Sequence, residues 1–204
     1  MHILNLEQGS DEWLKARLGK PTASRFGDII TPDKGDKSKT YTTYLYELLG
    51  ELLSDGKDES FKSEWMSRGN ELEEQAREKY EFLKDVSVQT VGIIFNDELT
   101  IGASPDGLIG SNAGIEIKCP KSSTIVKYML EDRLPLVYKP QVQGNLWISE
   151  REYWDFIAYH PNTNMFIHRV YRDDEYIKKM AMYLNEFVDE LNTKYEYLKN
   201  RVWV

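Results

Sequence analysis

Two carboxylates and a lysine lie close together in the middle of the chain, in the stretch ASPDGLIGSNAGIEIKCP that spans Ala103–Pro120. Asp106 follows a proline in an SPDG turn, and Glu116 and Lys118 belong to a short apolar segment typical of a β-strand. Because successive side chains of a strand point to opposite faces, Glu116 and Lys118 should project together from one face. Two carboxylates can hold a hard divalent cation, and a nearby lysine can position or activate a water molecule. The arrangement suits hydrolysis of a phosphodiester bond.

Each of these residues also has an ordinary structural interpretation. Asp-Gly is a common turn dipeptide, and polar residues on the solvent face of a strand are frequent. The joint pattern PD-x9-E-x-K between apolar strands is much less common than either feature alone, and it favours a site. Ile115 and Ile117, on the other face of the same strand, are expected to enter the core.

A third carboxylate is expected from the helix predicted over residues 60–82. At about 100° per residue, Glu73 falls within roughly 60° of Ala76 and Tyr80 on the apolar stripe, while the neighbouring glutamates point away. A buried bare charge is costly, so an inward carboxylate needs a partner. A metal ion or an arginine would serve.

Other candidate residues lie far upstream. Ser10 is a suitable N-cap for a first helix, and Arg17 follows Trp13 by four residues, so the two share a helix face. Ser24 stands at the start of a second expected helix, where hydroxyl and free N–H groups can bind an anion. From the residues alone, simple helix capping by Ser24 is the favoured interpretation. The polar, lysine-rich loop 31–40 has no assigned role.

The order of expected elements is helices, then three strands over 86–95, 99–103 and 114–118, a helical pair, a hairpin over 152–171 and a long helix over 173–199. The first two strands, which precede the SPDG turn, are expected to pair with each other. Pro140 suits the first position of the second helix in the pair, which puts Gln141 in its first turn. This order predicts an α/β fold with a mixed central β-sheet flanked by helices. The 204 residues are enough for one well-buried domain, and we expect a single nuclease domain over 1–204.

The net charge of −8 argues against a protein that coats DNA non-specifically. It does not exclude a nuclease, because metal ions neutralise active-site carboxylates and basic residues can gather on one face. The candidate basic set is Arg17, Lys20, Arg25, Lys34, Lys37, Lys39, Lys118, Lys121 and Lys127.

Composition and the absence of several motifs narrow the classes of function that the chain could have. Cys119 is the only cysteine, so an intrachain disulfide is impossible, and it is expected to fill space instead of acting as a nucleophile. The three histidines are not at ligand spacing, which argues against zinc catalysis. No GxSxG, P-loop or GxGxxG motif occurs. No apolar run approaches the length of a membrane span, and the N-terminus lacks the features of a signal peptide, so we expect a soluble, cytoplasmic protein.

Taken together and in order, several motifs resemble the phage lambda exonuclease (YqaJ-type alkaline exonuclease) family of the PD-(D/E)xK nuclease superfamily. They span most of residues 7–148 and read EQGSDEWLKARLGKPTAS, RGNELEEQAREKYEF, ASPDGL, GIEIKCP and QVQGNLWI. The resemblance implies a restriction-endonuclease-like core and a catalytic set of Glu73, Asp106, Glu116, Lys118 and Gln141.

By this resemblance, Asp106 and Glu116 would ligate Mg²⁺ together with the Ile117 carbonyl, and Glu73 would help to hold a second ion. Mn²⁺ can substitute in such sites. Lys118 would orient or deprotonate the attacking water, assisted by Gln141. Two ions can stabilise the attacking and leaving oxygens of an in-line displacement.

The resemblance also places Arg17, Ser24 and Ser104 in a pocket for the terminal 5′-phosphate. A guanidinium forks onto phosphate oxygens, which would explain an arginine on an apolar helix face.

The implied function is a Mg²⁺-dependent 5′→3′ exonuclease that digests one strand of double-stranded DNA and leaves a 3′ single-stranded overhang for recombination. The implied partners are a single-strand annealing protein and further copies in a ring-shaped homotrimer, in the bacterial host of a phage or prophage. Two alternatives stay open: an endonuclease of resolvase or restriction type on the same scaffold, and a non-catalytic protein that binds DNA ends.

Overall fold

The protein is described by a computed structural model over residues 1–57 and 70–201. In chain order its elements are β1 (His2–Leu4), α1 (Asp11–Arg17), the 3₁₀ turn η1 (Ala23–Arg25), α2 (Phe26–Ile29), α3 (Tyr41–Ser54), α5 (Asn70–Lys84), β2 (Ile93–Phe95), β3 (Gly102–Ala103), β4 (Gly107–Ile109), β5 (Ala113–Lys118), α6 (Ser122–Glu131), the 3₁₀ turn η2 (Leu136–Tyr138), α7 (Lys139–Ile148), β6 (Tyr153–Ala158), β7 (Phe166–Tyr171) and α8 (Asp174–Lys199).

The described strands form two sheets. A mixed four-stranded sheet has the order β4-β5-β6-β7, with β5 and β6 parallel and the outer pairs antiparallel. An antiparallel sheet of three short strands has the order β1-β2-β3. The expectation of an α/β fold with a mixed sheet flanked by helices is confirmed, with the correction that the strands before the SPDG turn belong to a separate sheet.

The strand expected over 86–95 is much shorter than its apolar pattern suggests. Only Ile93–Phe95 forms a strand. Upstream, Gln89 makes an isolated β-bridge to Leu108, in which the N–H of each residue donates to the carbonyl of the other. A Cβ built at Gly92 would lie 2.3 Å from the Leu6 carbonyl oxygen, so the chain here packs against another backbone segment. β1, which pairs with β2, was not predicted.

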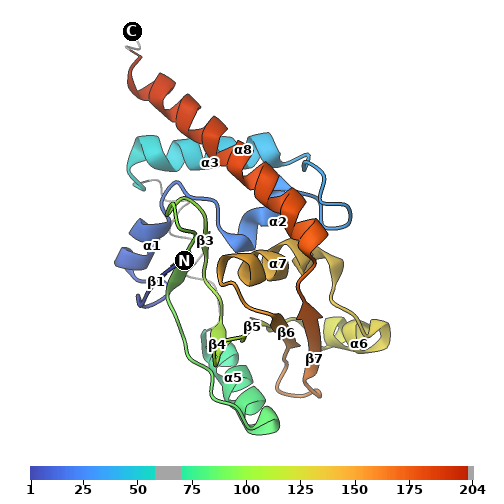
Figure 1. Ribbon diagram of the computed structural model, residues 1–204. Helices are drawn as coiled ribbons and strands as arrows, with labels where there is room; N and C mark the ends of the chain where they lie inside the picture. The colour runs from blue at the N-terminus through green and yellow to red at the C-terminus, as the bar shows by residue number, and fades with distance from the viewer. Residues whose placement is uncertain (58–69, 202–204) are drawn as a thin grey trace.

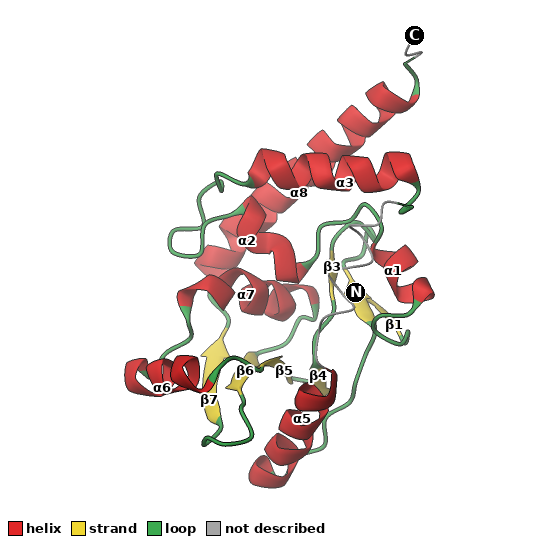
Figure 2. Cartoon of the chain, turned by 180° about the vertical axis from the view of Figure 1, so that it is seen from behind, coloured by secondary structure: helices red, strands yellow, loops and turns green. Residues whose placement is uncertain are grey.

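Helix α7 is the centre of the layered arrangement. It lies between the four-stranded sheet and the crossed pair α3 and α8, whereas α5 covers the opposite face of the sheet (Figures 1 and 2). Ile115 and Ile117 of β5 pack on the α5 side with Ala76 and Tyr80, as alternation along the strand predicts. Glu116 therefore faces α7.

The beginning of the helix expected over 60–82 lies outside the described residues, and its described part, α5, ends at Lys84. The second expected helix consists of the 3₁₀ turn η1 followed by the short α2. The first and last helices have clear N-caps. Ser10 caps α1 by accepting the Trp13 N–H, and Asp173 caps α8 by accepting the Tyr176 N–H. No helix in the described parts of the chain is both long and apolar enough to cross a membrane.

A buried carboxylate, paired with a partly exposed arginine, attaches α5 and β7 to the centre of the sheet. Asp155 of β6 is 1% exposed and accepts two hydrogen bonds from Arg169, at 2.8 Å from Nε and 2.9 Å from Nη2. It also accepts one from the Tyr80 hydroxyl at 2.7 Å. The carboxylate thus depends on partners from two other elements.

We predict that Arg169→Leu lowers the free energy of unfolding by about 3 kcal/mol, because removal of one partner leaves a buried carboxylate poorly compensated. Urea unfolding followed by circular dichroism measures this. The matched control is Lys127→Leu, which removes a cation from the exposed pair with Glu131 and should cost no more than about 0.5 kcal/mol. Equal losses in the two variants would contradict the role given to Asp155.

Candidate active site

The carboxylate of Glu116 is the most enclosed charge of the candidate site, with 1% of the residue exposed. Its Oε1 accepts hydrogen bonds from Lys118 Nζ at 2.5 Å and from Gln141 Nε2 at 2.6 Å. Its Oε2 accepts one from Asn145 Nδ2 at 3.1 Å. A buried carboxylate needs this many donors because burial without compensation is costly. Both Glu116 oxygens therefore have defined positions.

Two of these donors come from one face of α7. Gln141 and Asn145 are four residues apart, a spacing that puts side chains next to each other on a helix. Asn145 was not among the predicted site residues, although its spacing from Gln141 in QVQGN could have suggested it. Gln141 lies in the predicted site, where its amide binds Glu116. In the structure, Gln141 therefore positions the Glu116 carboxylate.

Lys118 projects from β5 on the same side as Glu116, as strand alternation predicts. Its side chain is 19% exposed, and its Nζ lies 5.5 Å from the centre of the Tyr138 ring. The ammonium is thus placed between the Glu116 carboxylate and an aromatic ring, at a point that solvent can still reach.

Asp106 joins the site from the turn before β4. Its Oδ2 accepts a hydrogen bond from the Ile117 N–H at 2.6 Å, which places the carboxylate next to β5 beyond the last β4 pair. The turn itself is held by Gln8, whose Nε2 donates to the Pro105 carbonyl, and by Arg77, whose Nη1 donates to the Asp106 carbonyl. Asp106, Glu116 and Lys118 thus converge as predicted.

The electrostatics of Asp106 indicate a crowded anionic site. Burial and the negative charges of Glu116 and Glu73 raise the pKa of Asp106 to about 8, against the opposing effects of Lys118 and the Ile117 N–H. Glu73 therefore lies close enough to affect Asp106, as its position on the helix stripe predicts. Accumulated negative charge of this kind is what a divalent cation neutralises.

The donor set can be tested against such a cation. Within residues 1–57 and 70–201, no three His, Cys, Asp or Glu side chains are gathered as ready-made ligands. The set instead combines the carboxylates of Asp106 and Glu116 with a backbone carbonyl. In a strand, the N–H and C=O of one residue point to the same side, so the Ile117 carbonyl points to the side where its N–H meets Asp106. Oxygen donors of this kind suit Mg²⁺ or Mn²⁺.

Cys119 is half-buried beside this site. Burial, followed by the charges of Glu73 and Asp106, raises the pKa of its thiol to about 11. The thiol is therefore protonated at neutral pH, which argues against a nucleophilic role, as expected from the sequence.

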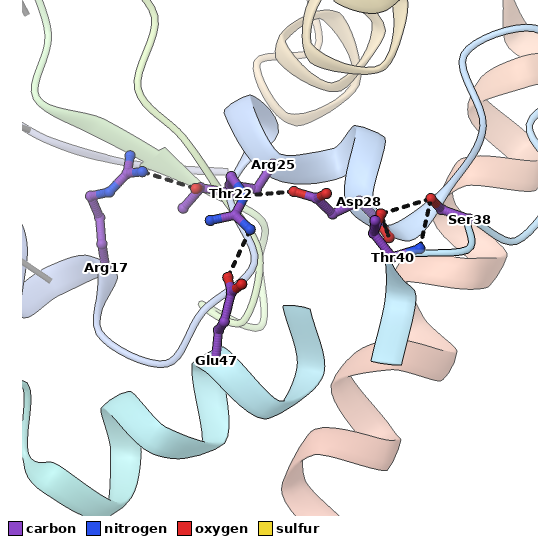
Figure 3. Close-up of polar contacts among 7 residues, drawn as sticks. All are labelled: Arg17, Thr22, Arg25, Asp28, Ser38, Thr40 and Glu47. Atoms are coloured by element: carbon purple, nitrogen blue, oxygen red, sulfur yellow. Dashed lines mark hydrogen bonds and ion pairs between the residues drawn. The ribbon is translucent and has the colours of Figure 1, made fainter. Parts of the chain in front are cut away.

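A second polar cluster is built around Ser104, which directly follows β3 and precedes Asp106 by two residues. The Arg17 side chain, in a residue 6% exposed, donates from Nη1 to Ser104 Oγ at 3.0 Å. Its Nη2 donates to Thr22 Oγ1 at 2.9 Å, the hydrogen bond drawn in Figure 3. Its guanidinium also stacks 4.3 Å from the centre of the Trp13 ring. The structure thus brings Arg17 and Ser104 together across 87 residues of sequence, as predicted.

The hydroxyl groups of this cluster have hydrogen-bonding capacity to spare. Ser104 Oγ accepts from both Arg17 and Trp13 Nε1, which uses its two lone pairs and leaves its proton to donate. Ser24 lies two residues after Thr22, and its Oγ is buried without a hydrogen-bond partner in the described part of the chain. Ser24 is thus linked to Arg17 through its position near Thr22, the hydrogen-bond partner of Arg17, and its unsatisfied buried hydroxyl is compatible with a pocket for an anion such as phosphate.

Not every cation of the candidate basic set is available for DNA. Figure 3 shows Arg25 directed at two carboxylates: Nε donates to Asp28 at 2.5 Å and Nη2 to Glu47 at 2.7 Å. In the loop 31–40, Lys37 lies 3.4 Å from Glu186 of α8. These two cations are neutralised by neighbours within the chain.

We predict that Asp106→Asn raises the melting temperature of the metal-free protein at pH 9 but much less at pH 5. Because the pKa of Asp106 is raised from 3.8 to about 8 on folding, the folded state holds its proton more tightly, and stability falls as pH rises through this range. The amide oxygen can keep the Ile117 bond without the charge. The gain should be about 2–4 °C for each kcal/mol relieved.

Differential scanning calorimetry at the two pH values measures this effect. The exposed carboxylate of Asp132 supplies the control, since Asp132→Asn should leave the melting temperature nearly unchanged at both. A wild-type protein as stable as Asp106→Asn at pH 9 would contradict the crowding of charge at this site.

Comparison with known proteins agrees with this geometry. Residues 12–152 match the model of the YqaJ-like viral recombinase domain. The chain is similar to an alkaline exonuclease, LHK-Exo from Laribacter hongkongensis, with 34% identity over 93% of this chain and 96% of that one, and a TM-score of 0.83. The same exonuclease in complex with dAMP gives 34% identity, the same coverage and a TM-score of 0.82.

A phage-related exonuclease from Haemophilus somnus shares the fold at 18% identity, over 86% of this chain and 96% of that one, with a TM-score of 0.60. No curated protein matches the chain significantly. The family match over residues 12–152 and the 34% identity to a solved relative lead to one conclusion. The chain belongs to the YqaJ-like viral recombinase domain family and has the PD-(D/E)xK type of α/β fold.

Proposed function

We propose that this protein is a phage-type exonuclease that digests one strand of double-stranded DNA in the 5′→3′ direction from a 5′-phosphorylated end. The observation that carries the proposal is the presence of two distinct polar sites in one fold. One has the carboxylates and lysine suited to phosphodiester hydrolysis, and the other has an arginine and hydroxyls suited to a terminal phosphate. The similarity to an alkaline exonuclease supports the same conclusion.

Asp106, Glu116 and the Ile117 carbonyl are the groups that would hold Mg²⁺ or Mn²⁺, with Glu73 near enough to assist with a second ion. When bound, such ions supply Lewis-acid activation of the phosphate and stabilise charge on the attacking and leaving oxygens. The raised pKa of Asp106 supports this assignment, because a carboxyl group that is hard to ionise alone gains from a nearby cation.

Lys118 would orient the attacking water as an ammonium or, in its neutral amine form, accept the proton of that water at Nζ. Its hydrogen bond to Glu116 Oε1 keeps the ammonium at the edge of the carboxylate site. Gln141 and Asn145 hold Glu116 in place, so they would act on the reaction by positioning this carboxylate. Positioned groups of this kind can be worth orders of magnitude in rate.

The pocket at Arg17 would make the enzyme an exonuclease. A terminal 5′-phosphate has more charge and more free oxygens than an internal phosphodiester, and an arginine with hydroxyl donors discriminates by these features. Ser104 would donate its remaining proton, and Ser24 would contribute its unsatisfied hydroxyl. Binding the end in this pocket would place the adjacent phosphodiester at the carboxylates.

The assembly is proposed from the family resemblance alone. A ring-shaped trimer around the duplex would allow repeated cleavage, and the 3′ overhang would be passed to a single-strand annealing protein in the bacterial host. The net charge of −8 is compatible with a ring whose outer surface is acidic and whose lumen is basic.

We predict that the wild-type protein with Mg²⁺ degrades blunt duplexes with 5′-phosphate ends faster than duplexes with 5′-hydroxyl ends. Arg17→Lys should reduce this preference about tenfold or more, because it loses a planar fork whose charge-assisted hydrogen bonds are worth about 1.5–3 kcal/mol each. Initial rates on end-labelled duplexes measure the preference, and product sizes from either label give the direction.

The matched control is Lys15→Ala on the same helix, which removes an exposed cation and should keep the wild-type preference. Asp106→Asn should abolish cleavage of both substrates. Equal wild-type rates on the two ends would contradict the phosphate pocket, and cutting of closed circular DNA at defined positions would favour an endonuclease. Cleavage that persists in Asp106→Asn would contradict the whole site.

A further inference from the structure

Helix α7 contacts the parts of the chain that carry both candidate sites. On the face toward β5, Gln141 and Asn145 bind the Glu116 carboxylate. On the face toward the N-terminal region, α7 packs against η1 and α2, and Ser24 lies within η1. Ser104 and Asp106, two residues apart, already link the two sites through one turn. The placement of η1 against α7 sets how far Ser24, the remaining hydroxyl of the proposed pocket, lies from the Glu116 carboxylate.

Gly144 is the point of closest approach at this contact. A Cβ atom built there would lie 2.5 Å from Cδ2 and 2.6 Å from Cε2 of Phe26, and 3.4 Å from the Cβ of Ala23. Phe26 is fully buried, and Ala23 is the residue before Ser24. Since carbon atoms in contact are normally about 3.5–4.0 Å apart, a methyl group at Gly144 would displace this region by about 1 Å.

A second glycine at the same interface has no such constraint. Gly27 of α2 faces Pro140 of α7, and a Cβ built at Gly27 would lie 3.8 Å from the Cγ of Pro140. This is an ordinary contact distance. The interface is thus tight at one glycine and open at the other, which provides a matched pair of substitutions.

We propose that the contact between Gly144 and Phe26 sets the spacing between Ser24 of the end-phosphate pocket and the Glu116 carboxylate, and so determines the preference for 5′-phosphorylated ends. This inference rests on the proposed function. The length of DNA backbone between a terminal phosphate and the first phosphodiester is fixed, so the two sites must be held at a matching distance. Gly144 and Phe26 are positioning residues in this account and touch no reacting atom.

A merely structural role for the glycine predicts a different result. If Gly144→Ala only destabilised the fold, the rates on phosphorylated and unphosphorylated ends would fall by the same factor. If it changes the spacing, the bound terminal phosphate holds the scissile bond away from the carboxylates. The rate on 5′-phosphate ends then falls toward the rate on 5′-hydroxyl ends, which do not use the pocket.

The test measures initial rates of Mg²⁺-dependent digestion on both kinds of blunt duplex, with thermal melting of each variant. Gly144→Ala should lose about 100-fold on 5′-phosphate ends, the loss typical of a displacement near 1 Å, and should change little on 5′-hydroxyl ends. Gly27→Ala should keep both rates within about twofold of wild type. The double variant Phe26→Val/Gly144→Ala should recover preference relative to Gly144→Ala, because the methyl group then occupies space left by the ring.

Phe26→Val alone tests the same contact if Gly144→Ala does not fold, since it removes the ring without adding a clash and should lower the preference severalfold. Three results would each overturn this inference and leave the proposed function standing. They are a folded Gly144→Ala that keeps the wild-type preference, equal losses of rate on both kinds of end, and an unchanged preference in Phe26→Val. A wild-type protein that digests both ends equally would overturn the proposed function, and this inference with it.

Discussion

The burial of the Glu116 carboxylate is the constraint on which the arrangement of the site depends. A charge at 1% exposure needs donors on both oxygens, and these come from Lys118 of its own strand and from Gln141 and Asn145 of α7. To present two amides to one carboxylate, α7 must lie directly over β5. That position requires further layers around α7, which α3 and α8 supply.

The two candidate sites are linked in two ways: Ser104 and Asp106 are two residues apart in one turn, and α7 connects Glu116 with the segment that carries Ser24. α7 holds Glu116 on one side and packs against η1 on the other, and η1 carries Ser24. β3 leads to Ser104, which bonds Arg17. A rigid helix between a site for chemistry and a site for the DNA end would give the distance between them a fixed value, as an enzyme that begins at an end requires.

Sequence reasoning succeeded where a regular period placed the side chain. The alternation of β5 put Glu116 and Lys118 on one face, and the helical period put Glu73 toward Asp106, whose pKa it raises. It failed where placement depends on tertiary contacts. The spacing of Asn145 from Gln141 shows that the two share a helix face but not that this face meets a buried carboxylate. The strand predicted from residue 86 begins only at Ile93, because apolar alternation indicates burial and not strand pairing.

The divalent-cation site proposed at Asp106 and Glu116 requires Asp106 to give up a proton when the ion binds. Titration of the protein with Mg²⁺ at pH 7.5, by calorimetry in two buffers of different ionisation enthalpy, measures this proton release. We predict binding with release of about one proton, since ligand carboxylates must ionise, and no release in Asp106→Asn. If Mg²⁺ does not bind, or if Asp106→Asn releases a proton as the wild type does, Asp106 and Glu116 do not form this site.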